Sequence, residues 1–175
     1  LVNGIIRAKE IGANTIQIFG SSPQQWAIRG HTKKDIGIFQ KAAREYDIGP
    51  IFVHASYLVN LASPDLLLRK KSELSLRAQL ELAGSIGADG LIFHIGSGKE
   101  MAKADAVEIV IKILKRIVRT ASGTAKLIIE NTAGGGQKVG SSLQEIGYIM
   151  KNVGSDRLKV CFDTAHAYEA GIIEE

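Results

Sequence analysis

The sequence predicts an α/β fold in which parallel strands alternate with helices. With 175 residues, 45% hydrophobic and 23% charged, the chain can form one sizeable core and is not disordered. Segments with helical apolar periodicity alternate with short apolar runs. These runs are apolar at successive positions, which is typical of parallel strands buried on both faces. We therefore expect a single α/β domain over residues 1–175.

The chain opens with a helix followed by a strand. Ile5, Ala8 and Ile11 recur at helical spacing, and Gly12 ends this helix. The β-branched run at 15–19 then forms the first strand. The rest of the chain repeats this unit of helix and strand.

The next two units keep the same order. Residues 33–46 have helical apolar spacing, and the short apolar strand 51–53 follows them. Asp65 can cap a long helix that ends near Ile86, ahead of the strand 91–93. The alternation has then occurred three times.

The last two units follow without a linker or a second domain. Helices are expected at about 104–120 and 142–153, and strands at 127–129 and 158–162. Parallel strands joined through helices have right-handed crossovers. The sequence therefore predicts five parallel strands.

The loop after the first strand favours a barrel over a dinucleotide-binding fold. It reads Gly20-Ser-Ser-Pro-Gln-Gln-Trp26 and lacks the G-x-G-x-x-G pattern. A (β/α)8 TIM barrel usually needs about 250 residues. Five strands therefore predict a partial barrel that lacks about the first strand and the last two. Its edge strands would expose unpaired backbone, so we expect residues 1–175 alone to be unstable and to self-associate.

Composition also limits the partners and the compartment. Lys and Arg number 22 against 18 Asp and Glu, and the net charge of +4 permits an anionic partner without requiring one. The single cysteine, Cys161, forms no internal disulfide, so we expect a reducing, cytoplasmic location. The apolar runs are far shorter than the roughly 20 residues that span a bilayer. No membrane partner is expected.

Residues of metal-ligand type stand at the ends of four predicted strands. Because parallel strands end on one rim, and this rim is the active-site face of a barrel, we expect these side chains to converge. A lone histidine at a strand end is more often structural, but four such residues at equivalent points favour a metal site. Zn²⁺ suits two imidazoles and two carboxylates, Mn²⁺ and Fe²⁺ are alternatives, and a carboxylate can bridge two ions. The residues are His54, His94, Glu130 and Asp163, with His166 as a fifth candidate.

Each of these strand ends begins a longer motif. The motifs are His54-Ala-Ser-Tyr-Leu-Val-Asn-Leu61, His94-Ile-Gly-Ser97, Glu130-Asn-Thr-Ala-Gly134 and Asp163-Thr-Ala-His166-Ala-Tyr-Glu-Ala-Gly171. In composition, order and spacing they resemble the endonuclease IV family, the zinc-dependent apurinic/apyrimidinic endonucleases. The likeness runs from residue 1 to about residue 171, and four motifs in register make it far more specific than any one of them.

This resemblance implies a TIM-barrel enzyme of DNA repair that acts in base excision repair. Such an enzyme cleaves the phosphodiester bond on the 5′ side of an abasic site in duplex DNA and leaves a 3′-hydroxyl. The complete enzyme holds three zinc ions, with Mn²⁺ as an alternative metal. A hydroxide activated by the metals attacks the phosphorus, and the complete enzyme is expected to be a monomer.

The resemblance also assigns roles to the ligand residues. His54, His94 and Glu130 would hold one zinc ion. Glu130, the residue expected to be catalytic, would bridge to a second ion that Asp163 also binds, and His166 would belong to the third. The family takes further ligands from its seventh and eighth strands. We therefore expect one complete ligand set within residues 1–175 and no cleavage by this segment alone.

DNA contacts are expected from the loops after residues 19 and 54. The candidates are Gln24, Trp26 and Tyr57. Many family members carry an arginine that inserts into the base stack, and Gln24 would have to take that place here.

Two other function classes stay open from the sequence. Sugar isomerases and epimerases of the same barrel superfamily bind one or two divalent ions with His, Glu and Asp at strand ends. The chain is alternatively a metal-binding or DNA-binding module without catalysis. The motif at Glu130 and the histidine at 166 favour the endonuclease.

Overall fold

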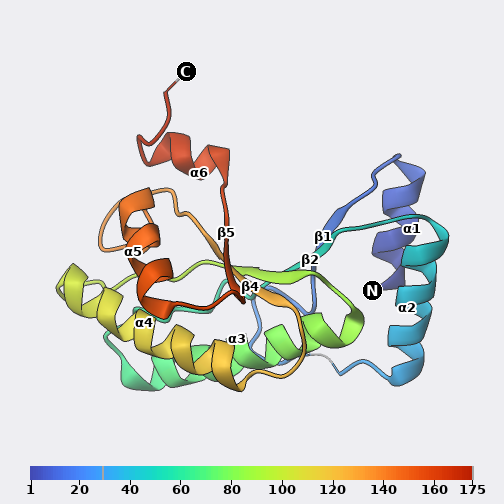
Figure 1. Cartoon of the computed structure of the whole chain (residues 1–175), viewed down its shortest axis with the longest axis horizontal. Coiled ribbons are helices and arrows are strands. Elements are labelled where there is room, and N and C mark those ends of the chain that lie inside the picture. Colours follow the sequence, from blue (N-terminus) through green and yellow to red (C-terminus); the bar gives the residue numbers. More distant parts are fainter. Residues whose placement is uncertain (29, 175) are drawn as a thin grey trace.

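A computed structural model describes residues 1–28 and 30–174 and contains one five-stranded parallel sheet (Figure 1). Each strand pairs in parallel with the next one along the chain, in the order β1-β2-β3-β4-β5. This arrangement confirms the predicted α/β fold and the partial barrel. The strands are β1 (Ile16–Phe19), β2 (Ile51–His54), β3 (Gly90–Phe93), β4 (Lys126–Glu130) and β5 (Leu158–Cys161).

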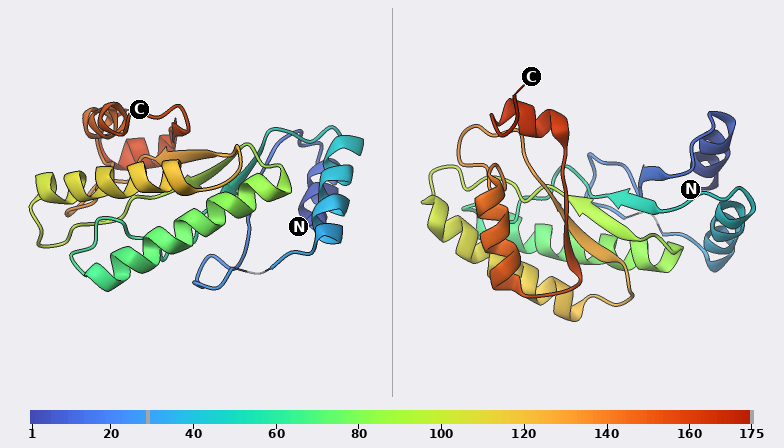
Figure 2. Two further views of the ribbon diagram at one scale, coloured as in Figure 1. Left: turned by 60° about the horizontal axis from the view of Figure 1, so that its bottom comes forward. Right: turned by 45° about the horizontal axis from the view of Figure 1, so that its top comes forward.

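Helices connect the strands and pack against one another in chain order, α1 on α2, α2 on α3, α3 on α4 and α4 on α5. In Figure 2 the long helices α3 and α4 lie along the same side of the sheet. None of the described helices is long and apolar enough to cross a membrane. The helices are α1 (Val2–Glu10), α2 (Lys33–Glu45), α3 (Leu66–Ile86), α4 (Lys103–Thr120), α5 (Leu143–Val153) and α6 (Thr164–Glu169).

Local signals explain where the helices begin and end. Thr32 starts α2 with a capping box. Asp65 caps α3 as expected, because its carboxylate accepts hydrogen bonds from two backbone N–H groups of the first turn. Gly12, with φ of 75°, takes the left-handed conformation that ends α1.

The predicted burial of the strands on both faces is confirmed for the centre of the sheet, and the two edge strands are partly exposed, as expected for a partial barrel. β2, β3 and β4 are buried at nearly every position. In β1 and β5, by contrast, Phe19 and Val160 are 38% and 42% exposed. Among the described residues β1 pairs only with β2, and β5 only with β4. Each edge strand therefore lacks the neighbour that would cover its outward positions.

The core fills the space between the helices and the central strands. Its largest side chains are fully buried, which fixes the sheet on which the strand-end residues stand. They include Phe39, Leu76, Leu80, Phe93, Leu114 and Leu127.

Candidate metal centre

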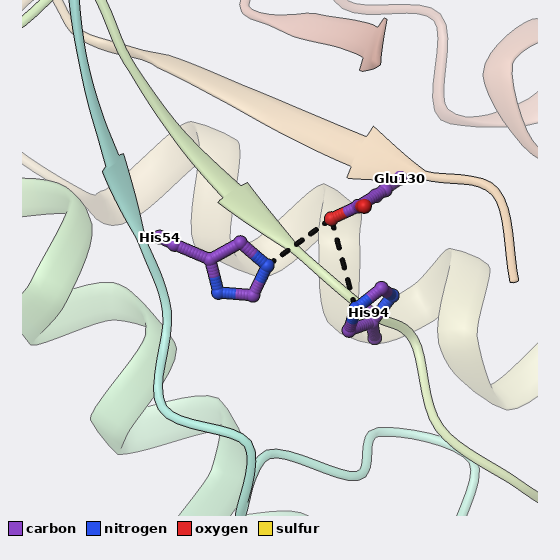
Figure 3. A group of neighbouring side chains, drawn as sticks. All are labelled: His54, His94 and Glu130. Carbon is purple, nitrogen blue, oxygen red and sulfur yellow. Dashed lines mark hydrogen bonds and ion pairs between the residues drawn. The ribbon is translucent and has the colours of Figure 1, made fainter. Parts of the chain in front are cut away.

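The five candidate ligands gather at the carboxyl-terminal rim of the sheet. His54 and Glu130 are the last residues of β2 and β4, and His94 directly follows β3. Parallel registration aligns these strand ends. Figure 3 shows the side chains of His54, His94 and Glu130 turned toward one another. The convergence predicted from the strand positions is therefore present.

Glu130 lies at the centre of the cluster. Its Oε2 atom is 3.1 Å from Nε2 of His54 and 3.6 Å from Nε2 of His94. Its Oε1 atom is 3.4 Å from Nδ1 of His166. The ligand atoms thus form two groups that share Glu130, one with His54 and His94 and one with Asp163 and His166, and within each group the atoms lie within 4.8 Å of one another.

The hydrogen bonds of His54 fit a cation bound between it and Glu130. Its Nδ1 atom lies 2.8 Å from the carbonyl oxygen of Ala55 and must donate the proton there. A neutral imidazole then presents only a lone pair at Nε2, yet this atom faces the Glu130 carboxylate at 3.1 Å. Both residues are at least nine-tenths buried. Two buried acceptors this close need a proton or a metal ion between them, so the donor set fits a divalent cation.

His94 supports the same conclusion. Its Nδ1 atom is buried and has no hydrogen-bond partner among the described residues. Burial lowers the pKa of His94, and this effect outweighs the attraction of the Glu130 carboxylate that raises it. The imidazole is therefore held in the neutral form that binds metals.

Asp163 and His166 form the other side of the cluster. Asp163 caps α6, and its Oδ1 atom accepts a hydrogen bond of 2.8 Å from the backbone N–H of His166, which lowers the pKa of the carboxyl group. Nδ1 of His166 lies 3.9 Å from Oδ2 of Asp163. The residue expected at a third metal therefore lies in one group with Glu130 and Asp163.

The three expected DNA contacts do not all lie at the cluster. Tyr57 is 61% exposed, and its ring centre is 5.5 Å from that of His54, so it stands on the rim. Trp26 is half-buried, and the ammonium of Lys71 on α3 lies 4.7 Å from its ring centre. Gln24 is exposed in the same loop.

A cleft of about 570 Å³ opens beside the cluster, between the loops that follow β2, β3 and β4. Two of the candidate ligands, His94 and His166, line it together with Tyr57. An antiparallel bridge between Ser97 and Lys138 joins two of these loops. The bridge therefore connects the loops after β3 and β4, which line the cleft.

Sequence reasoning missed the asparagines of this rim, although both stand inside quoted motifs. Asn131 is fully buried and binds the backbone of Asp163, and Asn60 binds the backbone of Ser97. For Asn131 the sequence offers one signal of such a role, because this amide directly follows the candidate ligand Glu130.

Known proteins resemble the chain over nearly its whole length. A family model described as xylose isomerase-like TIM barrel matches residues 5–175. A probable endonuclease 4 of Natranaerobius thermophilus is 39% identical over 166 residues, which cover 94% of this chain and 58% of the relative. Endonuclease 4 of Thermus thermophilus is 37% identical over 175 residues, covering 98% of this chain and 60% of the relative.

Solved structures agree with these similarities. The crystal structure of endonuclease IV from a strain of Thermus thermophilus superimposes with a TM-score of 0.81 at 33% identity, covering 96% of this chain and 59% of that one. A D-psicose 3-epimerase structure reaches a TM-score of 0.73 at 17% identity over 93% of this chain and 57% of its own, which shows a shared fold alone. The chain thus spans about three fifths of the length of the proteins it matches.

Proposed function

Because the chain belongs to the endonuclease IV family of xylose isomerase-like TIM barrels, we propose that the full-length protein containing it is a zinc-dependent DNA repair endonuclease. Its substrate is duplex DNA with an abasic site. It cleaves the backbone on the 5′ side of that site and leaves a 3′-hydroxyl, as in base excision repair. The observation that carries this proposal is the buried Glu130 carboxylate, which faces the lone pair of His54 and two further histidines.

We assign the metal ligands as follows within this proposal. His54, His94 and Glu130 hold one zinc ion, Glu130 and Asp163 bind a second, and His166 belongs to a third. Bound zinc would supply Lewis-acid stabilisation of the phosphorane-like transition state and an activated water at neutral pH. Within the chain, the bond from His54 to the Ala55 carbonyl orients the imidazole, and the shared carboxylate couples the two groups.

Tyr57 is the DNA contact that the geometry supports best. Its backbone N–H donates to the carbonyl of Pro23 at 3.0 Å, which ties the loop after β2 to the loop after β1. Its exposed ring offers a stacking surface beside the ligands. A nucleotide that already lacks its base costs the least to turn out of the duplex and into such a cleft. We propose Gln24 and Trp26 as further contacts along the DNA.

The remaining expectations form part of the proposal. A full-length family member with these residues would be a cytoplasmic monomer, and residues 1–175 alone would be inactive. The sugar epimerase alternative is not proposed, because the similarity to solved epimerases shows the fold alone.

The test uses the zinc-loaded full-length protein and an end-labelled duplex with one stable abasic analogue. We expect one incision on the 5′ side of the analogue, with a 3′ end that a DNA polymerase extends directly. The same duplex with a normal base at that position is the control. A zinc-loaded protein that leaves the abasic strand intact, or that yields a blocked 3′ end, would overturn the proposal. Conversion of a ketohexose by the same preparation would support the epimerase instead.

A further inference from the structure

Asn131 binds Asp163 through both ends of its side-chain amide. Its Oδ1 atom accepts a hydrogen bond of 2.6 Å from the backbone N–H of Asp163, and its Nδ2 atom donates one of 2.9 Å to the backbone carbonyl of the same residue. Asn131 is fully buried. The amide donor and the amide acceptor of Asn131 therefore both bond to the backbone of one residue, which lies 32 positions further along the chain.

This amide continues the sheet beyond the point where the strands end. The register of β4 and β5 stops at Glu130 opposite Cys161, and the next backbone bond, from Asn131 to Cys161, is long at 3.4 Å. The side chain of Asn131 then takes the place that a paired strand backbone would occupy. The segment after β5 is thereby held although none of the described strands lies beside it.

A third contact from the same residue reaches His166. The backbone carbonyl of Asn131 lies 3.0 Å from Nδ1 of His166 and accepts a hydrogen bond from the N–H at this position. The proton on Nδ1 leaves the lone pair of Nε2 free for a metal ion. One residue thus fixes the position of Asp163 and the tautomer of His166.

The segment that carries these two residues lies mostly at the surface. α6 spans six residues, and among them only Ala167 is buried. Figure 1 shows α6 at the far end of β5, beyond the body of the sheet. The side chains of Asp163 and His166 are 34% and 29% exposed. The bonds to Asn131 therefore act together with the bond from the N–H of His166 to the Asp163 carboxylate in fixing this segment.

We propose that Asn131 is a positioning residue, which holds Asp163 beside Glu130 for the ion that these two carboxylates bind and holds His166 with the lone pair of Nε2 free for a further ion. It touches no reacting atom itself. The identity of the ion rests on the proposed function, whereas the orientation of the two ligands rests on the contacts of Asn131.

Asn60 offers a matched comparison. Its amide donates to the carbonyl of Ser97 and accepts from the N–H of Ser97, both at 3.1 Å. Ser97 lies three residues after His94, on the opposite side of the cluster from Asp163. Removing this amide loosens a loop of the same rim without touching the segment at 163–166.

The experiment titrates the metal-free full-length protein with Zn²⁺ against a competing chelator. An Asp163→Ala variant identifies the binding step that depends on Asp163. Loss of a residue that orients a ligand typically weakens metal binding by about 10- to 100-fold, and we expect this loss for Asn131→Ala in that step. The Zn²⁺ affinity of the step assigned to His54 and His94 should change by less than about twofold.

Two controls and one double variant separate positioning from general damage. Asn60→Ala and the surface variant Asn152→Ala should leave the Asp163-dependent step unchanged. Asn131→Ala added to Asp163→Ala should cause no further loss, because the two residues act through one site. The proposal would be overturned if Asn152→Ala lost as much Zn²⁺ affinity in this step as Asn131→Ala. It would also be overturned if the losses of affinity from Asn131→Ala and Asp163→Ala added fully in the double variant.

A measurement on the unaltered protein covers the case in which Asn131→Ala does not fold. In the metal-free protein we expect the Asp163 amide to exchange its hydrogen as slowly as the amides of β5, and ¹⁵N shifts to show His166 protonated on Nδ1. Exchange at the rate of an open loop, or protonation on Nε2, would overturn the inference. Absence of zinc binding by the unaltered protein would refute the proposed function instead, and zinc binding that Asn131→Ala leaves unchanged would refute this inference alone.

Discussion

Replacing Glu130 with glutamine should have opposite effects on metal binding and on the stability of the metal-free protein. Glu130→Gln keeps the volume of the side chain but removes its charge. Nδ1 of His54 donates to the carbonyl of Ala55, which leaves the lone pair of Nε2 facing the Glu130 carboxylate at 3.1 Å. A glutamine amide offers a donor at this point. We expect the variant to bind zinc more weakly and to melt at a higher temperature without metal.

The structure sets the size of both effects. Zinc sites with four protein ligands have binding free energies of about 10–16 kcal/mol, so one ligand accounts for about 2.5–4 kcal/mol, or about a 100- to 1000-fold change in Kd. Glu130 belongs to both ligand groups, so each group loses one of its three members. In the metal-free protein, one new hydrogen bond contributes about 0.5–1.5 kcal/mol, which raises the Tm by about 1–6 °C for a chain of this size.

Two assays check this prediction. Zinc affinity is measured by competition with a chelating dye, and thermal unfolding is followed by calorimetry in excess chelator at pH 8. Glu108→Gln is the control, because this exposed carboxylate bonds only to Tyr148 in the described structure and lies outside the cluster. An unchanged zinc affinity would refute the ligand role of Glu130. A lower Tm of the metal-free variant would refute the repulsion inferred between Glu130 and His54.

Three further predictions concern the surrounding structure. Arg157→Ala removes bonds of 3.0 and 2.7 Å to carbonyls at the end of α4, so calorimetry should show a free energy of unfolding lower by about 1.5–3 kcal/mol. Gly96→Ala should cost about 2 kcal/mol or more in urea unfolding, because φ is 107° and an added Cβ would collide with the side chain of Asn60. Burial lowers the pKa of His94, so as the pH falls below 6.5 the imidazole of His94 is protonated in the unfolded chain before it is protonated in the folded one. Metal-free stability should therefore decline as the pH falls below 6.5, and urea unfolding at several pH values should show a smaller decline for His94→Asn.

The sequence contained most of what positions the candidate ligands. Helical and strand periodicity is local, so the five strands could be assigned from the chain itself. The parallel geometry then brings residues that end successive strands to one rim. His54, His94 and Glu130 could therefore be grouped without any knowledge of their contacts, and the structure brings them together.

What the sequence could not predict depends on contacts between distant segments. The apolar pattern of a strand does not say whether a neighbour covers it, so the exposure of Phe19 in β1 could be expected only from the number of strands and not from the pattern of β1 itself. The position of Trp26 depends on its contact with Lys71, 45 positions along the chain. The two hydrogen bonds between the Asn131 amide and the Asp163 backbone depend likewise on the path of two loops, which local propensity does not encode.

The rate of abasic-site incision tests the central claim most directly. The unaltered full-length protein and its Glu130→Ala variant are compared at equal protein concentration on a duplex with one abasic site, with zinc content measured for both. We predict steady incision 5′ to the abasic site by the unaltered protein and none by the variant, because both ligand groups lose the carboxylate they share. Near-normal turnover by Glu130→Ala would contradict the account.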